Sequence, residues 1–174
     1  EWEFHSAVMA QEELARISVP VVAPDHMEGL FIAAARPTMA DVDDKTLPHE
    51  LDWLRTAVHL NKGCYRGQEA VAKVHNLGHP PRRITLLHLD GSESLLPSAG
   101  DEVMLGEKTV GRITRAAWHY ELGPIALAML KRTTPVDEVL SAITGGRTVI
   151  ANQEVLVPVD AGATRDIPRL GRLR

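Results

Sequence analysis

The sequence has few aromatic side chains and only one cysteine. Phe, Trp and Tyr together make up 4% of its 174 residues, so a broad aromatic platform that stacks the bases of a single strand is excluded. The single cysteine, Cys64, excludes a disulfide within the chain and any site that needs several thiolates. We therefore expect a protein of the reducing cytoplasm.

Long hydrophobic runs are also missing. The sequence has no run of roughly 18 uninterrupted apolar residues, which a membrane-spanning helix needs. Residues 1–5, Glu-Trp-Glu-Phe-His, lack the charged and apolar regions of a signal peptide. We expect no membrane association. Because the first residue is not Met, we also expect this sequence to be part of a longer protein.

The composition that is present matches a globular domain. Hydrophobic residues make up 44% and charged residues 24%, enough to bury a core of Leu, Val, Ile and Ala. The net charge of -4 is unevenly distributed, because residues 1–60 carry -7 and residues 61–174 carry +3. Residues 61–83 form one basic run, in which Glu69 is the only acid and the bases are Lys62, Arg66, Lys73, Arg82 and Arg83. Such a run either only solubilises the surface or forms a docking patch.

The part of the chain before residue 82 is predicted to be mainly helical. Apolar periodicity, proline positions and capping residues place the elements. They are a helix over residues 7–17 closed by Pro20 and Pro24, a buried strand over 30–35, a helix capped by Thr46 with Pro48 in its first turn, and a helix from Gly67 to a stop at Gly78.

From residue 82 onward the pattern changes to short strands. Apolar runs alternate with glycines and turn residues, which predicts a small antiparallel barrel or sandwich. The predicted strands cover residues 84–89, 102–105, 109–117, 125–130 and 154–159. We therefore expect an α+β fold, with one domain over residues 1–81, a β-barrel domain over residues 82–160 and a flexible tail over residues 161–174.

One segment carries unusual chemistry: residues 62–69, Lys-Gly-Cys-Tyr-Arg-Gly-Gln-Glu. A thiol reacts as its thiolate, and nearby cations and a helix N-terminus favour that anion. Cys64 has Lys62 and Arg66 close in sequence and the predicted helix after it, while Gly63 and Gly67 permit a tight loop. Cys64 is therefore a candidate reactive thiol. The alternative is a buried cysteine that only packs.

Other chemical sites have weaker sequence support. His75 and His79 are four residues apart and could bind a metal together with Cys64. Gly78 and Pro80 argue against a continuous helix through both histidines, and a structural metal would need a fourth ligand. We expect no metal site.

The sequence also contains a polar pair next to a proline. His49 and Glu50, directly after Pro48, are either acid–base candidates or polar residues that cap and solvate the first turn of a helix. The sequence contains no phosphate-binding glycine loop and no Gly-x-Ser-x-Gly elbow. This leaves residues 62–69 as the main candidate site.

Residues 62–69 resemble the signature of the YgfZ family of folate-binding, iron–sulfur-related proteins, with every position except Arg66 fixed in that signature. The resemblance covers residues 28–160 and includes Leu-Pro-His-Glu at 47–50. The segments Val-Gly-Arg-Ile-Thr at 110–114 and Leu-Gly-Pro-Ile-Ala-Leu-Ala at 122–128 are similar to the C-terminal barrel of the glycine cleavage T protein. That aminomethyltransferase is related to YgfZ but lacks the Cys-Tyr pair, so Cys64 and Tyr65 favour YgfZ.

The resemblance implies that residues 1–81 are the C-terminal portion of an aminomethyltransferase-like folate-binding domain, with tetrahydrofolate as cofactor. The implied site roles are Cys64 as a functional thiol, Lys62 and Arg66 as anion-holding cations, Tyr65 as a pteridine contact or core residue, and Gln68 and Glu69 as cofactor contacts or helix caps. In the transferases an acidic residue contacts folate where this sequence has Ala33 or Ala34.

The sequence is compatible with three functions. The first is a folate-binding accessory protein that supports assembly or maintenance of iron–sulfur enzymes, including tRNA-modifying ones. The second is a tetrahydrofolate-dependent one-carbon transferase. The third is a docking module for tRNA or protein that uses the basic run. The expected partners are accordingly folate, iron–sulfur client enzymes or cluster assembly factors, and tRNA.

Overall fold

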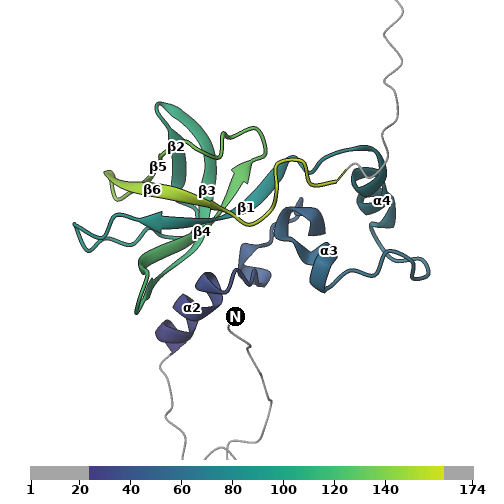
Figure 1. Cartoon of the computed structure of the whole chain (residues 1–174), viewed down its shortest axis with the longest axis horizontal. Coiled ribbons are helices and arrows are strands. Elements are labelled where there is room, and N and C mark those ends of the chain that lie inside the picture. Colours follow the sequence, from purple (N-terminus) through teal and green to yellow (C-terminus); the bar gives the residue numbers. More distant parts are fainter. Residues whose placement is uncertain (1–23, 163–174) are drawn as a thin grey trace, which may run out of the picture.

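The computed structural model describes residues 24–162 (Figure 1). In this part of the chain, helical segments come first and a β-barrel follows. The helical elements are α2 (Pro24–Ala33), the 3-10 turns η1 (Met39–Asp41) and η2 (Pro48–Leu51), α3 (Trp53–Thr56) and α4 (Gln68–Leu77). The predicted helix over residues 7–17 lies outside the described residues.

The barrel is closed and antiparallel. Its strands are β1 (Arg82–Leu89), β2 (Glu102–Leu105), β3 (Lys108–His119), β4 (Gly123–Lys131), β5 (Leu140–Thr144) and β6 (Arg147–Val155). The strand order among the described residues is β1-β4-β3-β2-β5-β6, and β6 returns to pair with β1. The prediction of an α+β fold with a small antiparallel barrel is confirmed.

The two β strands nearest the C-terminus are where the sequence prediction fails. Predicted strands 84–89, 102–105, 109–117 and 125–130 coincide with β1 to β4. β5 is not predicted, because its alternation extends over only five residues. The predicted strand over 154–159 is wrong for most of its length: β6 begins at Arg147, directly after a turn made by two positive-φ glycines, and ends at Val155.

The predicted strand over residues 30–35 is also wrong. Its first residues belong to α2, which begins at Pro24. A short apolar run does not distinguish a strand from a buried helix, and here packing decides. Gly29 brings α2 against β3, since a Cβ at this position would lie 2.6 Å from the carbonyl oxygen of Trp118.

The helix expected after Thr46 is divided into η2 and α3. Pro48 is the first residue of η2, as its fixed φ allows. Asp52 then adopts a left-handed φ of 58° and separates the two short helices. Thr46 does not cap a helix; its hydroxyl donates a hydrogen bond to Asp43 Oδ1 at 2.7 Å.

The barrel has apolar side chains on both faces of β1 and β4. Leu87 on β1 and Ala126, Ala128 and Leu130 on β4 belong to one hydrophobic cluster, and the alternating residues of the same strands belong to a second. The second cluster includes Ile32 of α2 and Leu51 of η2. The helical segments therefore cover the outer face of these strands, in agreement with the placement of α2 beside β3 and β4 in Figure 1.

No helix within residues 24–162 is both long enough and apolar enough to cross a membrane.

Candidate functional site

The loop that carries Cys64, residues 62–67, lies between α3 and α4 and is called the Cys64 loop below. Gly67, the N-cap residue directly before α4, has a φ of 86°, and a side chain there would be strained. Gln68 closes the loop in both directions: its Oε1 accepts a hydrogen bond from the Tyr65 N–H at 3.1 Å, and its own N–H donates to the Tyr65 carbonyl at 3.3 Å. The Gln68 side chain therefore fixes the loop in front of α4, and no side chain of residues 24–162 caps the N-terminus of this helix.

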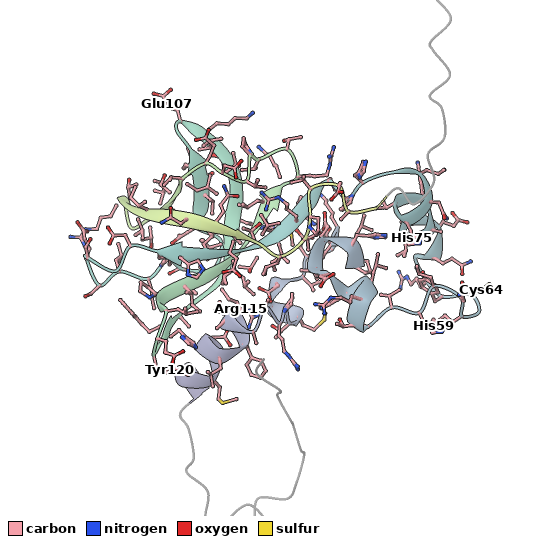
Figure 2. All side chains as sticks on the ribbon, in the orientation of Figure 1. His59, Cys64, His75, Glu107, Arg115 and Tyr120 are labelled. Atoms are coloured by element: carbon pink, nitrogen blue, oxygen red, sulfur yellow. The ribbon has the colours of Figure 1, made fainter. Side chains whose placement is uncertain are left out.

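Cys64 is exposed in this loop. Figure 2 places it with His59 at the end of the helical part that lies farthest from the barrel, at the tip of a projecting segment. Gly63 and Arg66 are exposed as well. The alternative of a buried cysteine that only packs is therefore wrong, and the thiol is open to reagents and partners.

Lys62 and Tyr65 contact each other within the same loop. The Lys62 ammonium nitrogen lies 5.3 Å from the centroid of the Tyr65 ring, a cation–π distance. Tyr65 is half-buried and Lys62 is exposed. The pair thus presents a cation above a partly covered aromatic ring.

A hollow of about 580 Å³ is bounded by this loop and one face of α4. Four of the predicted cofactor-binding residues line it, namely Lys62, Tyr65, Gln68 and Glu69; Arg66 and Cys64 do not. The other lining residues are Leu60, Asn61, Ala72, His75 and Asn76. Gln68, Ala72 and His75 follow helical spacing on α4, so this periodicity was the sequence signal that could have found His75.

His49 and Glu50 are buried rather than solvated. His49 on η2 is 2% exposed and Glu50 is fully buried. The rings of His49 and His75 are 6.1 Å apart between centroids, so His49 lies directly behind one wall of the hollow. Burial and the neighbouring His75 lower the pKa of His49.

The predicted basic run is not one surface. Arg82 donates hydrogen bonds to Asp43 and Glu50, and these two carboxylates raise its pKa. Arg83 is fully buried, and its guanidinium donates to Thr85 Oγ1 at 2.7 Å and to other uncharged acceptors. Only Lys62, Arg66 and Lys73 remain as exposed bases of this run, beside exposed Glu69.

The histidine–cysteine combination does not form a metal site in the described part of the chain. Residues 24–162 contain no cluster of three or more His, Cys, Asp or Glu side chains arranged to hold a metal. α4 ends at Leu77, so His79 lies beyond the helix that carries His75, and its Nδ1 lies 3.0 Å from the carbonyl oxygen of Ala161.

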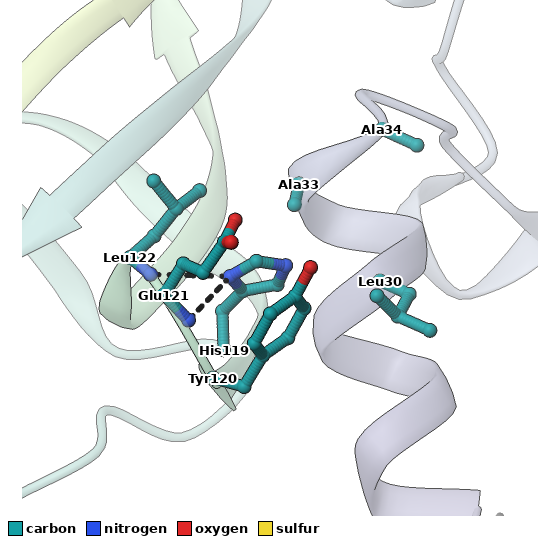
Figure 3. A pocket seen from close by; sticks show the side chains of 7 residues that line it. All are labelled: Leu30, Ala33, Ala34, His119, Tyr120, Glu121 and Leu122. Carbon is teal, nitrogen blue, oxygen red and sulfur yellow. Dashed lines mark hydrogen bonds between the residues drawn. The ribbon is translucent and has the colours of Figure 1, made fainter. Parts of the chain in front are cut away.

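A second, smaller hollow of about 170 Å³ lies between α2 and the hairpin that joins β3 to β4 (Figure 3). Ala33 and Ala34 form part of its helical wall. On the hairpin, His119 Nδ1 accepts hydrogen bonds from the N–H groups of Glu121 and Leu122, at 3.2 and 3.1 Å. The helical wall is thus apolar at the position where the transferases are expected to have a folate-contacting acid.

Comparison with known proteins supports the fold. No protein-family model and no curated protein matches the sequence. Among solved structures, the chain is similar to aminomethyltransferase T of the glycine cleavage system from Bartonella henselae, with 18% sequence identity and a TM-score of 0.58 over 76% of this chain. The chain spans 37% of the length of that protein. At this identity the likeness establishes an aminomethyltransferase-like fold.

Proposed function

We propose that this protein is a folate-binding accessory protein that supports the assembly or maintenance of iron–sulfur enzymes, including tRNA-modifying ones. The observation that carries the proposal is the Cys64 loop itself. An exposed thiol sits on a loop closed by Gly67 and Gln68, and the same loop lines a hollow of about 580 Å³. Small-molecule sites commonly have volumes of about 300–1,000 Å³.

The residues of the hollow fit a folate. A folate has a flat heteroaromatic ring at one end and carboxylates at the other. Lys62 lies 5.3 Å from the centroid of the half-buried Tyr65 ring, so both residues would serve the same end of the ligand: Lys62 would hold a carboxylate, and Tyr65 would pack beside it. Asn76 and His75 add polar side chains on the α4 wall. Tetrahydrofolate, when bound, would supply a carrier for a one-carbon unit.

The protein's own residues would have separate tasks. Lys62 would hold the anionic end of the ligand, with Arg66 as a second cation at the exposed side of the loop. Gln68 would fix the loop backbone through its hydrogen bond to the Tyr65 N–H. Cys64 would act on the client enzyme rather than inside the hollow, because it is exposed and does not line the hollow.

A tetrahydrofolate-dependent one-carbon transferase is the second candidate. The fold of the aminomethyltransferase neighbour supports it, but Ala33 and Ala34 provide no acid on the helical wall facing the β3–β4 hairpin. A docking module for tRNA is supported less, since Arg82 and Arg83 are not available to phosphates. Salt-sensitive RNA binding without folate would favour that third function.

Calorimetric titration of the 174-residue chain with tetrahydrofolate tests the proposal. The variant Lys62→Met should weaken binding about tenfold, the loss of one charge-assisted contact. Lys108→Met, an exposed lysine at the start of β3, is the matched control and should leave binding unchanged. Absence of binding, or equal effects of the two substitutions, would contradict the placement of folate in this hollow.

A further inference from the structure

The imidazole of His49 has an unusual environment. The residue is 2% exposed, and neither Nδ1 nor Nε2 has a hydrogen-bond partner among the described residues. A neutral imidazole has one donor and one acceptor, and leaving both buried without partners costs free energy. An apolar side chain would avoid this cost. Stability alone therefore does not explain a histidine at this position.

The position of His49 connects it to the Cys64 loop. η2, which carries His49, is packed against α4. The ring of His75 on α4 is tilted by 39° to that of His49, with 6.1 Å between the centroids. His75 lines the hollow, together with Tyr65 and Gln68. His49 therefore supports the α4 wall of the hollow from behind.

Within residues 24–162, His49 forms no ion pair, because the charged groups near it are bound to other residues. Glu50 is its neighbour in sequence, but both Glu50 oxygens accept hydrogen bonds from Arg82 of β1, and one also accepts from the Leu47 N–H. On α3, Arg55 pairs with Asp52, which lies at the start of that helix, at 2.7 Å.

The remaining nearby titratable groups are histidines. His75 faces His49 from α4, and His79 follows the end of α4 with its Nδ1 at the Ala161 carbonyl. A proton on His49 would thus place a charge in a buried position beside another imidazole, with the nearest carboxylate already bound to Arg82. Burial is the main cause that lowers the pKa of His49 and His75 is the second, while the charge of Glu50 acts in the opposite direction with a smaller effect.

We propose that His49 is a pH-sensitive positioning residue of the hollow: its neutral form holds α4 against η2, and its protonation releases α4. The Gln68 and His75 side of the hollow moves with this helix. The release itself is independent of any ligand. Its consequence, weaker folate binding at acidic pH, rests on the proposed function.

The sign of the pH dependence follows from the lowered pKa. The neutral form is favoured in the folded protein, so the packing is complete above the ordinary histidine value of 6.5. It is lost as the pH falls from this value toward the lower value of folded His49. Within that window a single proton changes the opening equilibrium by up to about tenfold per pH unit.

Amide hydrogen exchange of α4, corrected for the intrinsic effect of pH on exchange, tests the proposal between about pH 7.5 and 5.5. Protection of α4 should fall on acidification in the wild-type chain. In His49→Leu it should remain constant over this range. The matched control is His59→Leu, because His59 is exposed in the segment before the Cys64 loop; it should behave as the wild type. The same pH dependence in His49→Leu as in the wild type would overturn the proposal.

Proton NMR titration of the histidine rings in the wild-type chain needs no variant. It tests the proposal even if His49→Leu does not fold. His49 should titrate below 6.5. Titration of His49 at or above 6.5, or α4 protection independent of pH, overturns the proposal. Failure of folate to bind at any pH would instead contradict the proposed function, and the exchange result would remain interpretable by itself.

Discussion

Asp43 and Arg82 form an ion pair with two hydrogen bonds that joins the helical segment to the barrel. Arg82 Nη1 lies 2.7 Å from Asp43 Oδ2, and Nη2 lies 3.0 Å from Oδ1. Arg112 of β3 also donates to the Asp43 carboxylate, and Arg82 also binds buried Glu50. The charges therefore alternate along a connected network, and each has a neighbour of opposite sign.

A similar contact lies two residues earlier in the chain. Asp41 is 4% exposed and accepts hydrogen bonds from Thr114 and Arg115 of β3. Arg115 also pairs with Glu28 of α2 at 2.9 Å. Acids on the helical side thus meet arginines on the barrel side at two places. These ion pairs and the shared hydrophobic cluster together hold the helical segments against the barrel.

We expect Asp43→Asn to destabilise the protein by about 2 kcal/mol, because it leaves two arginines with one charged partner fewer in a partly buried site. Urea unfolding measures this change. Asp44→Asn is the matched control: Asp44 is the adjacent residue, and it is exposed. Its substitution should change the free energy of unfolding by less than about 0.5 kcal/mol. Equal effects of the two variants would show that the network does not stabilise the fold.

The lowered pKa of the Asp43 carboxyl predicts that the free energy of unfolding depends on pH. Hydrogen bonds from Arg82 hold the pKa of Asp43 well below its usual value of 3.8. A lowered carboxyl pKa contributes stability that is present above the unfolded value and lost as the pH falls below it. The wild-type chain should therefore lose more stability than Asp43→Asn between about pH 4 and 2. Parallel curves for the two proteins in acid denaturation would contradict this assignment.

Gly29→Ala should shift α2 relative to β3 and destabilise the protein. A Cβ at Gly29 would lie 2.6 Å from the backbone oxygen of Trp118, so α2 or β3 has to shift, at an expected cost of about 1–3 kcal/mol. Gly63→Ala is the control, because a Cβ there has no atom within 4 Å and its φ is not positive. A thermal unfolding midpoint equal to that of the control would show that α2 adapts without cost.

Much of the barrel could be predicted from the sequence because local signals and tertiary structure agree there. Strands β1 to β4 have apolar runs bounded by turn residues, and Gly67, Gln68 and Gly78 mark the limits of α4. Gly63 and Gly67 also predicted a tight loop around Cys64, and Gly67 has a positive φ there. These features depend on residues close together in the chain.

The rest depended on contacts between distant residues. Whether residues 30–35 form a helix or a strand is decided by packing against β3 and β4, which periodicity over so few residues does not reveal. From the sequence, Arg82 is expected to be a surface base. In the fold it is bound to Asp43, which lies 39 residues earlier in the chain. The sequence suggests only a metal-binding role for His75, because its neighbour in the fold, His49, is on another element.

Cys64→Ala tests whether the thiol is needed for function rather than for stability. Because the thiol is exposed, its removal creates no cavity, and we expect the free energy of unfolding to change by less than about 0.5 kcal/mol. If the proposed function is correct, the variant will nevertheless fail to restore iron–sulfur enzyme activity in cells that lack the native protein. Lys108→Met, which changes an exposed residue on the barrel, should restore it fully. A folded Cys64→Ala variant with full restoration would show that the thiol carries no chemistry, and the exposed cations Lys62 and Arg66 would then be the residues to test as a docking surface.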